Sequence, residues 1–127
     1  MRICVDIDGV ICNLKKKNEL YIDLQPVNGA IKKLNELKKN GHYIILFTAR
    51  NMKTQNANMG RVIQNIGLQT LQWLEKHQVP YDEIYFGKPW ADIYIDDNAF
   101  RFNTWNEIDD YGSNLPVSNE QKTRGDE

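Results

Sequence analysis

The sequence is poor in the residues that bind soft metals or form disulfides. Its 127 residues include two cysteines and two histidines. Cys4 and Cys12 lie on one short segment, poorly placed for a structural disulfide, and neither has a nearby histidine to activate it. With so few His and Cys ligands, a zinc site is disfavoured. We therefore expect free thiols, a reducing compartment and a cytoplasmic protein.

Long hydrophobic runs and an excess of one charge are also missing. No apolar run approaches the ~18 residues that a membrane-spanning helix needs, and the N-terminal residues are typical of a strand, not of a signal peptide. The 16 basic and 17 acidic residues leave a net charge of −1, so no basic field is present to attract nucleic acid. We expect neither a membrane nor a nucleic acid as a partner.

What is present is an alternation of strand and helix patterns. Short runs rich in Val, Ile and aromatic residues predict strands over 3–7, 43–47, 83–86 and 92–95. Apolar residues at helical spacing predict one helix over 27–37, stopped by Gly41. A second helix carries Ile63, Ile66, Leu71 and Leu74 and has Gly67 as a candidate break. Residues 13–25 predict a flap or hairpin, 51–60 a polar loop and 100–111 a short amphipathic turn or helix.

This order of elements predicts one α/β domain, a three-layer α/β/α sandwich with a central parallel sheet. The domain covers residues 1–116, and a polar tail, 117–127, is expected to be poorly ordered. The first strand has few polar interruptions, so we expect it to be the central strand and to be covered on both faces.

Polar residues follow the end of each predicted strand: Asp6, Asp8 and Gly9, then Thr48, then Lys88, then Asp96 and Asp97. Ligands of parallel α/β sheets bind at this edge, so we expect these residues to converge. Carboxylates gathered in one crevice repel each other, which a hard cation such as Mg²⁺ resolves. Such a site suits phosphate. One carboxylate can attack phosphorus, and a second can transfer the proton of the leaving oxygen.

The sequence resembles the haloacid dehalogenase (HAD) superfamily in the order and spacing of four motifs. These are Asp6-Ile7-Asp8-Gly9-Val10, Thr48, Lys88-Pro89 and Asp96-Asp97. The resemblance implies a Rossmann-like fold in which Asp6 is the nucleophile, Asp8 the general acid/base, and Thr48 and Lys88 the phosphate binders. It also implies that Asp96 and Asp97, with Asp6 and the Asp8 carbonyl, hold Mg²⁺. Aspartate at the second position is typical of the phosphatase branch.

A closer resemblance concerns the run 48–54 together with Thr70-Leu71 and Trp73-Leu74. It is similar to the capsule (polysaccharide) biosynthesis phosphatases and implies a sugar or polyol phosphate as substrate. One helix, one strand and a loop fill each interval between motifs, which leaves no room for the cap domain of many HAD enzymes. A homo-oligomer, with a tetramer preferred, is therefore expected to close the site. The candidate substrate-binding residues are Gly9, Ala49, Arg50, Asn51 and Lys53.

Other interpretations of the same residues stay open. A structural ion pair explains Arg50 nearly as well as substrate contact does. For the whole chain, the alternatives are a phosphotransferase or mutase that uses the same aspartyl-phosphate, and a non-catalytic phospho-ligand-binding module. A receiver domain would place its acidic pair first and its phosphorylated Asp later, the reverse of the order here, and Asp8 favours turnover over binding alone.

Overall fold

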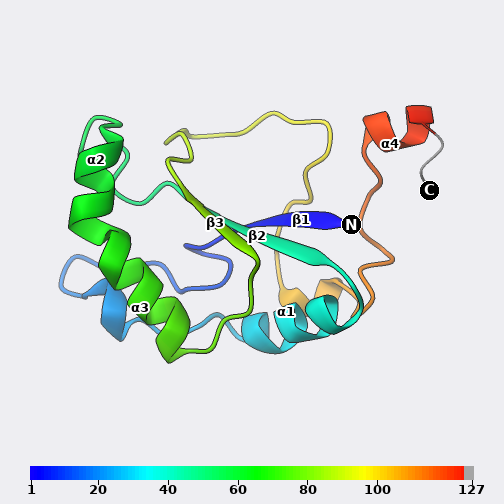
Figure 1. Cartoon of the computed structure of the whole chain (residues 1–127), viewed down its shortest axis with the longest axis horizontal. Helices are drawn as coiled ribbons and strands as arrows, with labels where there is room; N and C mark the ends of the chain where they lie inside the picture. The colour runs from blue at the N-terminus through cyan, green and yellow to red at the C-terminus, as the bar shows by residue number, and fades with distance from the viewer. Residues whose placement is uncertain (125–127) are drawn as a thin grey trace.

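Three parallel strands form the sheet of this computed structural model, which describes residues 1–124. They are β1 (Arg2–Asp6), β2 (Tyr43–Thr48) and β3 (Glu83–Phe86), each within one residue of its predicted bounds. The order is β1-β2-β3, so β2 is the middle strand and β1 lies at an edge. The prediction that the first strand is central is wrong for the described residues. All three carboxyl ends nevertheless meet at one edge of the sheet (Figure 1).

The predicted fourth strand, over 92–95, is absent. Ile95 is 96% exposed there, and Ile93 is 65% exposed. The Tyr94 hydroxyl donates to the carbonyl of Pro89, so the segment folds back on itself instead of extending along β1. Four residues of alternating polarity are too short for their pattern to decide between a strand and an exposed turn.

Two helical segments connect the strands. The first is α1 (Ala30–Lys39), and the second consists of α2 (Met59–Val62), the π-helical turn η2 (Ile63–Gly67) and α3 (Leu68–Lys76). The second segment continues through Gly67, where a break was a candidate, and Gly67 is the last residue of the π-helical turn. The loop predicted over 51–60 is a series of turns up to residue 57, and helix begins at Met59.

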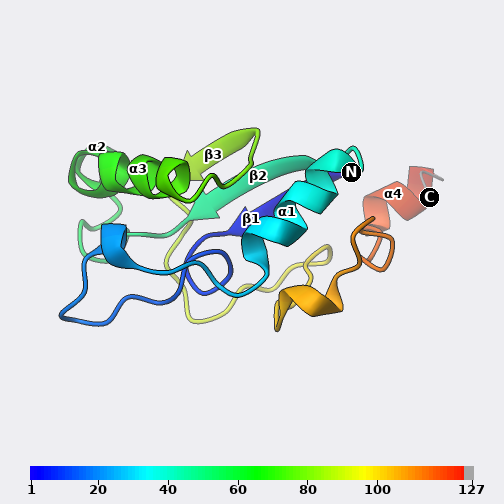
Figure 2. The same ribbon diagram turned by 90° about the horizontal axis from the view of Figure 1, so that it is seen from below.

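The hydrophobic core lies between these helices and the sheet. It joins side chains from α1, α3 and β2, namely Leu34, Leu37, Trp73, Leu74, Ile44 and Leu46. Along β2 the residues alternate between buried and half-buried, so one face of the sheet is packed more tightly than the other. Right-handed crossovers that proceed in one direction put both helices on the same face. Figures 1 and 2 show this arrangement, with residues 88–100 passing on the other side of the sheet in Figure 1. The predicted α/β class with a parallel sheet is confirmed.

The flap region lies against α3 and does not form a hairpin. Residues 13–25 contain one short 3-10 turn, η1 (Tyr21–Asp23), and isolated bridges pair Cys12 with Asp8 and Pro26. The Trp73 indole of α3 donates a 2.8 Å hydrogen bond to the carbonyl of Leu24. This bond ties the flap to the helix that follows β2.

The C-terminal part returns to the start of the chain. The predicted turn over 100–111 contains η3 (Trp105–Glu107), and the buried Trp105 indole donates to the carbonyl of Val10 at 2.7 Å. Part of the tail expected to be poorly ordered forms α4 (Asn119–Arg124), and residues 125–127 lie outside the described part.

Among the described residues, no helix combines the length and apolar character needed to cross a membrane.

Candidate active site

The turn after β1 positions the first two carboxylates. The carbonyl of Ile7 accepts hydrogen bonds from the N–H groups of residues 10–12, at 2.9 to 3.3 Å. Gly9 has a φ of +85°, a conformation that a residue without a Cβ adopts at little cost. The closed turn fixes Asp6 and Asp8 at the carboxyl end of β1.

Asp6 faces an ammonium group and an open edge of the site. Its Oδ2 lies 3.4 Å from Nζ of Lys88, and its side chain is 36% exposed. Burial raises the pKa of the Asp6 carboxyl, and the charge of Lys88 opposes that rise. Lys88 is itself fixed to the neighbouring strand, because its N–H donates to the carbonyl of Thr48 at 3.1 Å. The two charged groups therefore come from the ends of different strands and meet as predicted.

Asp8 is held by a guanidinium group. Nε of Arg50 donates to both carboxylate oxygens at 3.0 Å, and Nη2 donates to Oδ1 at 2.9 Å. Oγ1 of Thr48 donates to Oδ2 at 3.4 Å. The Arg50 side chain is 1% exposed and that of Asp8 is 25% exposed. The structure thus brings Asp8 and Thr48 together as predicted, but Arg50 is buried and not at the substrate rim.

Two further residues hold Arg50, and neither was a predicted site residue. Nη1 of Arg50 donates to Oγ1 of Thr70 at 3.0 Å, and the guanidinium lies 4.1 Å from the ring centroid of Tyr21. Thr70 is fully buried on α3, a helix in which other polar residues face solvent. The one sequence signal for Thr70 was the resemblance of Thr70-Leu71 to the capsule biosynthesis phosphatases. Nothing local in the sequence indicates the role of Tyr21.

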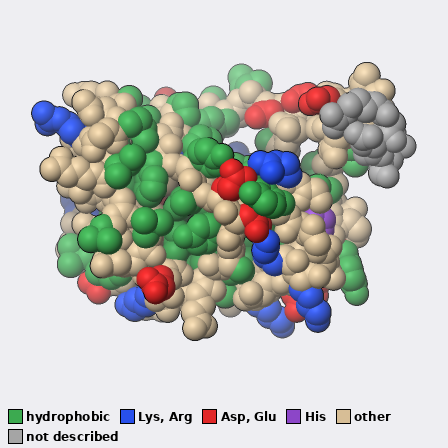
Figure 3. Space-filling view, viewed as in Figure 1, with side chains coloured by type: hydrophobic (Ala, Val, Ile, Leu, Met, Phe, Trp, Pro, Cys, Tyr) green, Lys and Arg blue, Asp and Glu red, His purple; other side chains and the backbone are tan. Residues whose placement is uncertain are grey.

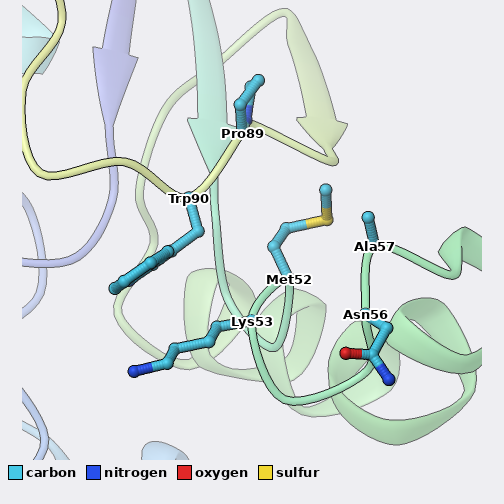
Figure 4. Close-up of a pocket in the computed structure, with 6 residues that line it drawn as sticks. All are labelled: Met52, Lys53, Asn56, Ala57, Pro89 and Trp90. Atoms are coloured by element: carbon cyan, nitrogen blue, oxygen red, sulfur yellow. The ribbon is translucent and has the colours of Figure 1, made fainter.

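Lys53 lies at a surface recess beside Trp90, and its contact with a substrate stays a prediction. Its Nζ lies 4.5 Å from the ring centroid of Trp90. Both residues line a recess of about 440 Å³, together with Met52, Asn56, Ala57 and Pro89. Figure 4 shows the Trp90 ring alongside the Lys53 side chain, with Asn56 and Ala57 across the recess. Of the other predicted rim residues, Asn51 accepts a hydrogen bond from Asn65, and Ala49 packs against a small cluster around Met52.

The four residues predicted to bind the metal do not come together. Asp96 accepts from the N–H of Asn98, and Asp97 accepts from the Asn119 side chain at 3.3 Å, in exposed segments. Within residues 1–124, no group of three or more His, Cys, Asp or Glu side chains is arranged to hold a metal. The physical reason is the absent fourth strand, whose end was to carry Asp96 and Asp97 to Asp6. This arrangement of residues does not fit a Mg²⁺ site.

The cysteines offer no nucleophile. Burial raises the pKa of the Cys12 thiol to about 11, and burial also raises the pKa of Cys4. A thiol in that range is protonated near neutral pH, and only the thiolate is strongly nucleophilic. The carboxylates and Lys88 are therefore the reactive groups at this edge of the sheet.

One family model matches the chain over residues 16–111, that of the 5' nucleotidase, deoxy (pyrimidine), cytosolic type C proteins. The chain belongs to this family. It is accordingly a phosphatase of the HAD superfamily, a phosphoric monoester hydrolase. The match includes Thr48, Lys88 and the Asp96-Asp97 pair, and it begins after Asp6 and Asp8. The match does not confirm the capsule biosynthesis subfamily.

Two solved structures are similar to this chain in fold. A crystal structure of a target protein from Vibrio cholerae is 33% identical, with a TM-score of 0.73, over 97% of this chain and 94% of that one. A chain of a Pnkp1/Rnl/Hen1 complex is 23% identical, with a TM-score of 0.50, over 76% of this chain and 30% of that one, and it shows a shared fold. A comparison with curated proteins found no match.

Proposed function

We propose that this phosphatase hydrolyses small phosphate monoesters through an aspartyl-phosphate on Asp6. The observation that carries the proposal is the half-buried Asp6 carboxylate beside Nζ of Lys88, at the strand edge shared with Asp8 and Thr48. A carboxylate can attack phosphorus only if the charge of the phosphate is offset. Lys88 supplies positive charge at that point, and the open edge leaves room for an incoming ester.

The reaction then has two displacement steps. In the first, a carboxylate oxygen of Asp6 forms a bond to phosphorus while the ester P–O bond breaks. Asp8 enters this step in its protonated form and gives its proton to the leaving oxygen, which leaves Asp8 as a carboxylate. In the second, Asp8 accepts a proton from a water molecule, whose oxygen attacks phosphorus. Inorganic phosphate leaves, and the Asp6 carboxylate is regenerated. A general acid/base in this position contributes about 10²–10⁴-fold to the rate.

We propose Mg²⁺ as the cofactor on the basis of the family, which in general uses this ion. The predicted ligands are Asp6, the Asp8 carbonyl, Asp96 and Asp97. Because the described arrangement does not assemble this set, no step above is assigned to the metal. Activity measured with Mg²⁺ and with EDTA tests the requirement directly.

Two classes of substrate are supported by different observations. The motif around 48–54 supports a sugar or polyol phosphate of polysaccharide biosynthesis. The family match supports a nucleoside 5'-monophosphate, and the exposed Trp90 ring in the recess offers a surface for a planar base. Release of inorganic phosphate from a panel that contains both classes distinguishes them by kcat/KM.

The decisive experiment compares the wild type with Asp6→Asn on an aryl phosphate and on that panel. Asn keeps the shape of Asp but is not a carboxylate nucleophile, so we expect a loss of at least about 10³-fold in kcat. Mass spectrometry of Asp8→Ala during turnover should detect a phosphorylated enzyme. A matched control is Asp92→Asn, which removes one charge from an exposed position. Retained activity in Asp6→Asn would show that another group attacks phosphorus.

The exposed apolar surface supports our proposal of a homo-oligomer. Figure 3 shows hydrophobic side chains gathered on the face where β3 lies. The exposed large hydrophobic residues of the described chain include Tyr85, Trp90 and Ile93. Patches of this kind mark interaction surfaces. Sedimentation equilibrium of the purified chain distinguishes a monomer from a tetramer.

A further inference from the structure

The guanidinium of Arg50 is the most completely enclosed charged group at the site. Its side chain is 1% exposed, against 20% for that of Lys88. Its Nε and Nη2 atoms both donate to Asp8, and Nη1 donates to Thr70. Tyr21 covers the plane of the group at 4.1 Å. Every nitrogen atom of the guanidinium therefore has a partner within the protein.

This enclosure is inconsistent with direct binding of a substrate phosphate. A phosphate that bound Arg50 would have to displace the Asp8 carboxylate from a two-pronged ion pair. Such a pair uses the planar fork of arginine and is among the strongest side-chain interactions. Lys88, in contrast, has a single carboxylate contact at 3.4 Å and a fifth of its side chain exposed. Of these two cations, Lys88 is the one that an incoming anion can reach.

We propose that Arg50 is a positioning residue: it fixes the orientation of the Asp8 carboxylate next to Asp6 and does not bind substrate. This positioning role rests on the proposed function, because the proposed function assigns the proton transfer to Asp8. Three elements converge to hold the guanidinium, since Asp8 follows β1, Thr70 lies on α3 and Tyr21 belongs to η1 of the flap. The flap thereby contributes to the site through Tyr21.

The Thr70 contact depends on the helix that carries it. Oγ1 of Thr70 donates to the carbonyl of Ile66 at 2.8 Å, and it accepts from Arg50. Ile66 lies in the π-helical turn, so the local helix geometry sets the direction in which the Thr70 hydroxyl presents its lone pairs. A valine at this position keeps the shape of the side chain and removes the acceptor. Thr70→Val is therefore a mild variant that loosens Arg50 without removing its charge.

The first test measures binding of inorganic phosphate by calorimetry and needs no turnover. For Arg50→Lys and Thr70→Val we expect dissociation constants within about twofold of the wild type, since neither residue contacts the anion. For Lys88→Met we expect binding about tenfold weaker or more, the usual effect of losing a charged hydrogen-bond partner. A loss of phosphate affinity in Arg50→Lys equal to that in Lys88→Met would overturn the proposal.

The second test separates kcat from KM on an aryl phosphate. Arg50→Lys should lower kcat by about 10- to 100-fold, part of the contribution of a general acid/base, while KM stays within about twofold. Thr70→Val should show the same pattern with a smaller loss, and it carries the test if Arg50→Lys does not fold. A rise in KM with kcat unchanged is the signature of lost substrate binding and would contradict the positioning role.

A spectroscopic measurement keeps the two proposals separate. The Nε–H signal of Arg50 in a nitrogen-15 NMR spectrum should exchange slowly in the wild type and in Asp6→Asn, and fast in Asp8→Asn. If the wild type releases no phosphate from any substrate, the proposed function fails, while the NMR signal and the phosphate affinities still decide whether Arg50 holds Asp8. If the Nε–H signal exchanges fast in the wild type, the positioning role fails whatever the activity.

Discussion

The two carboxylates after β1 differ in what surrounds them. Asp6 has one ammonium neighbour and an open side, whereas Asp8 accepts three contacts from Arg50 and one from Thr48. Different surroundings are how an active site assigns different roles to two groups of the same chemistry. The accessible carboxylate suits attack on phosphorus, and the firmly oriented one suits proton transfer along a fixed direction.

Gly87 is the residue whose backbone sets the position of Lys88. Its φ is +95°, and Gly41 has a similar φ of +92° with nothing near its missing Cβ. We expect both Gly87→Ala and Gly41→Ala to lower the free energy of unfolding by about 1–2 kcal/mol, the usual cost of that conformation. A Cβ added at Gly87 would also come within 2.8 Å of the Met59 sulfur, which a flexible side chain can relieve by moving.

Activity distinguishes these two glycine variants. Only Gly87 precedes Lys88, so Gly87→Ala should lower kcat/KM for an aryl phosphate well below that of Gly41→Ala at equal stability. Urea denaturation and steady-state kinetics on both variants provide the comparison. Equal activities would mean that the ammonium group reaches Asp6 independently of the backbone before it.

At the scale of elements, the strand ends bring the polar residues together over long separations in sequence. β1, β2 and the end of β3 supply Asp6, Thr48 and Lys88, and these three follow from motif order and parallel pairing alone. The position of β1 at the edge of the sheet could not be predicted from the sequence. A run with few polar residues predicts that a strand is buried, but it does not indicate whether other strands or other segments cover it. The burial of Arg50 was also unpredictable. It depends on Tyr21 and Thr70, which lie on elements whose packing no local pattern specifies.

The loop over 109–114 gives an element-scale prediction about pH. Asp109 accepts hydrogen bonds from the Ser113 hydroxyl and from the N–H groups of Tyr111, Ser113 and Asn114, and they lower its pKa from 3.8 to about 2. Because the folded-state pKa is the lower one, this contribution to stability is complete above pH 3.8 and is lost as the pH falls through about 2.

Asp109→Asn removes that titration. We expect its thermal unfolding midpoint to fall less steeply than that of the wild type between about pH 4 and pH 2, measured by circular dichroism. Asp92→Asn, an equal change of charge at an exposed position, should keep the wild-type slope. Identical slopes for wild type and Asp109→Asn would show that these hydrogen bonds do not persist in solution.

At the scale of the whole molecule, the C-terminal part completes the core and supports the turn that carries Asp8. Trp105 is 3% exposed, packs against Phe102 with ring centroids 5.3 Å apart, and donates to Val10. We expect Trp105→Ala to lower the free energy of unfolding by about 3–5 kcal/mol, the usual cost of emptying such a site. Trp90→Ala is the matched control: Trp90 is 54% exposed, so a change within about 0.5 kcal/mol is expected.

Urea denaturation followed by circular dichroism measures both tryptophan variants, since fluorescence changes when either ring is removed. A loss of stability in Trp105→Ala as small as that in Trp90→Ala would mean that residues 101–115 are not part of the cooperative unit. A large loss confined to Trp105→Ala would mark this segment as essential to the domain.

The hydrogen bond from Trp105 to Val10 joins residues 95 positions apart and so also has a kinetic consequence. During synthesis at about 5–20 residues per second, roughly 5–20 s pass between the appearance of the Asp8 turn and that of its tryptophan partner. Through that interval the growing chain has its first strand and its reactive aspartates but lacks the indole that supports them. We expect the nascent protein to stay without activity until the last quarter of the chain has been released, and to depend most on chaperones during that wait.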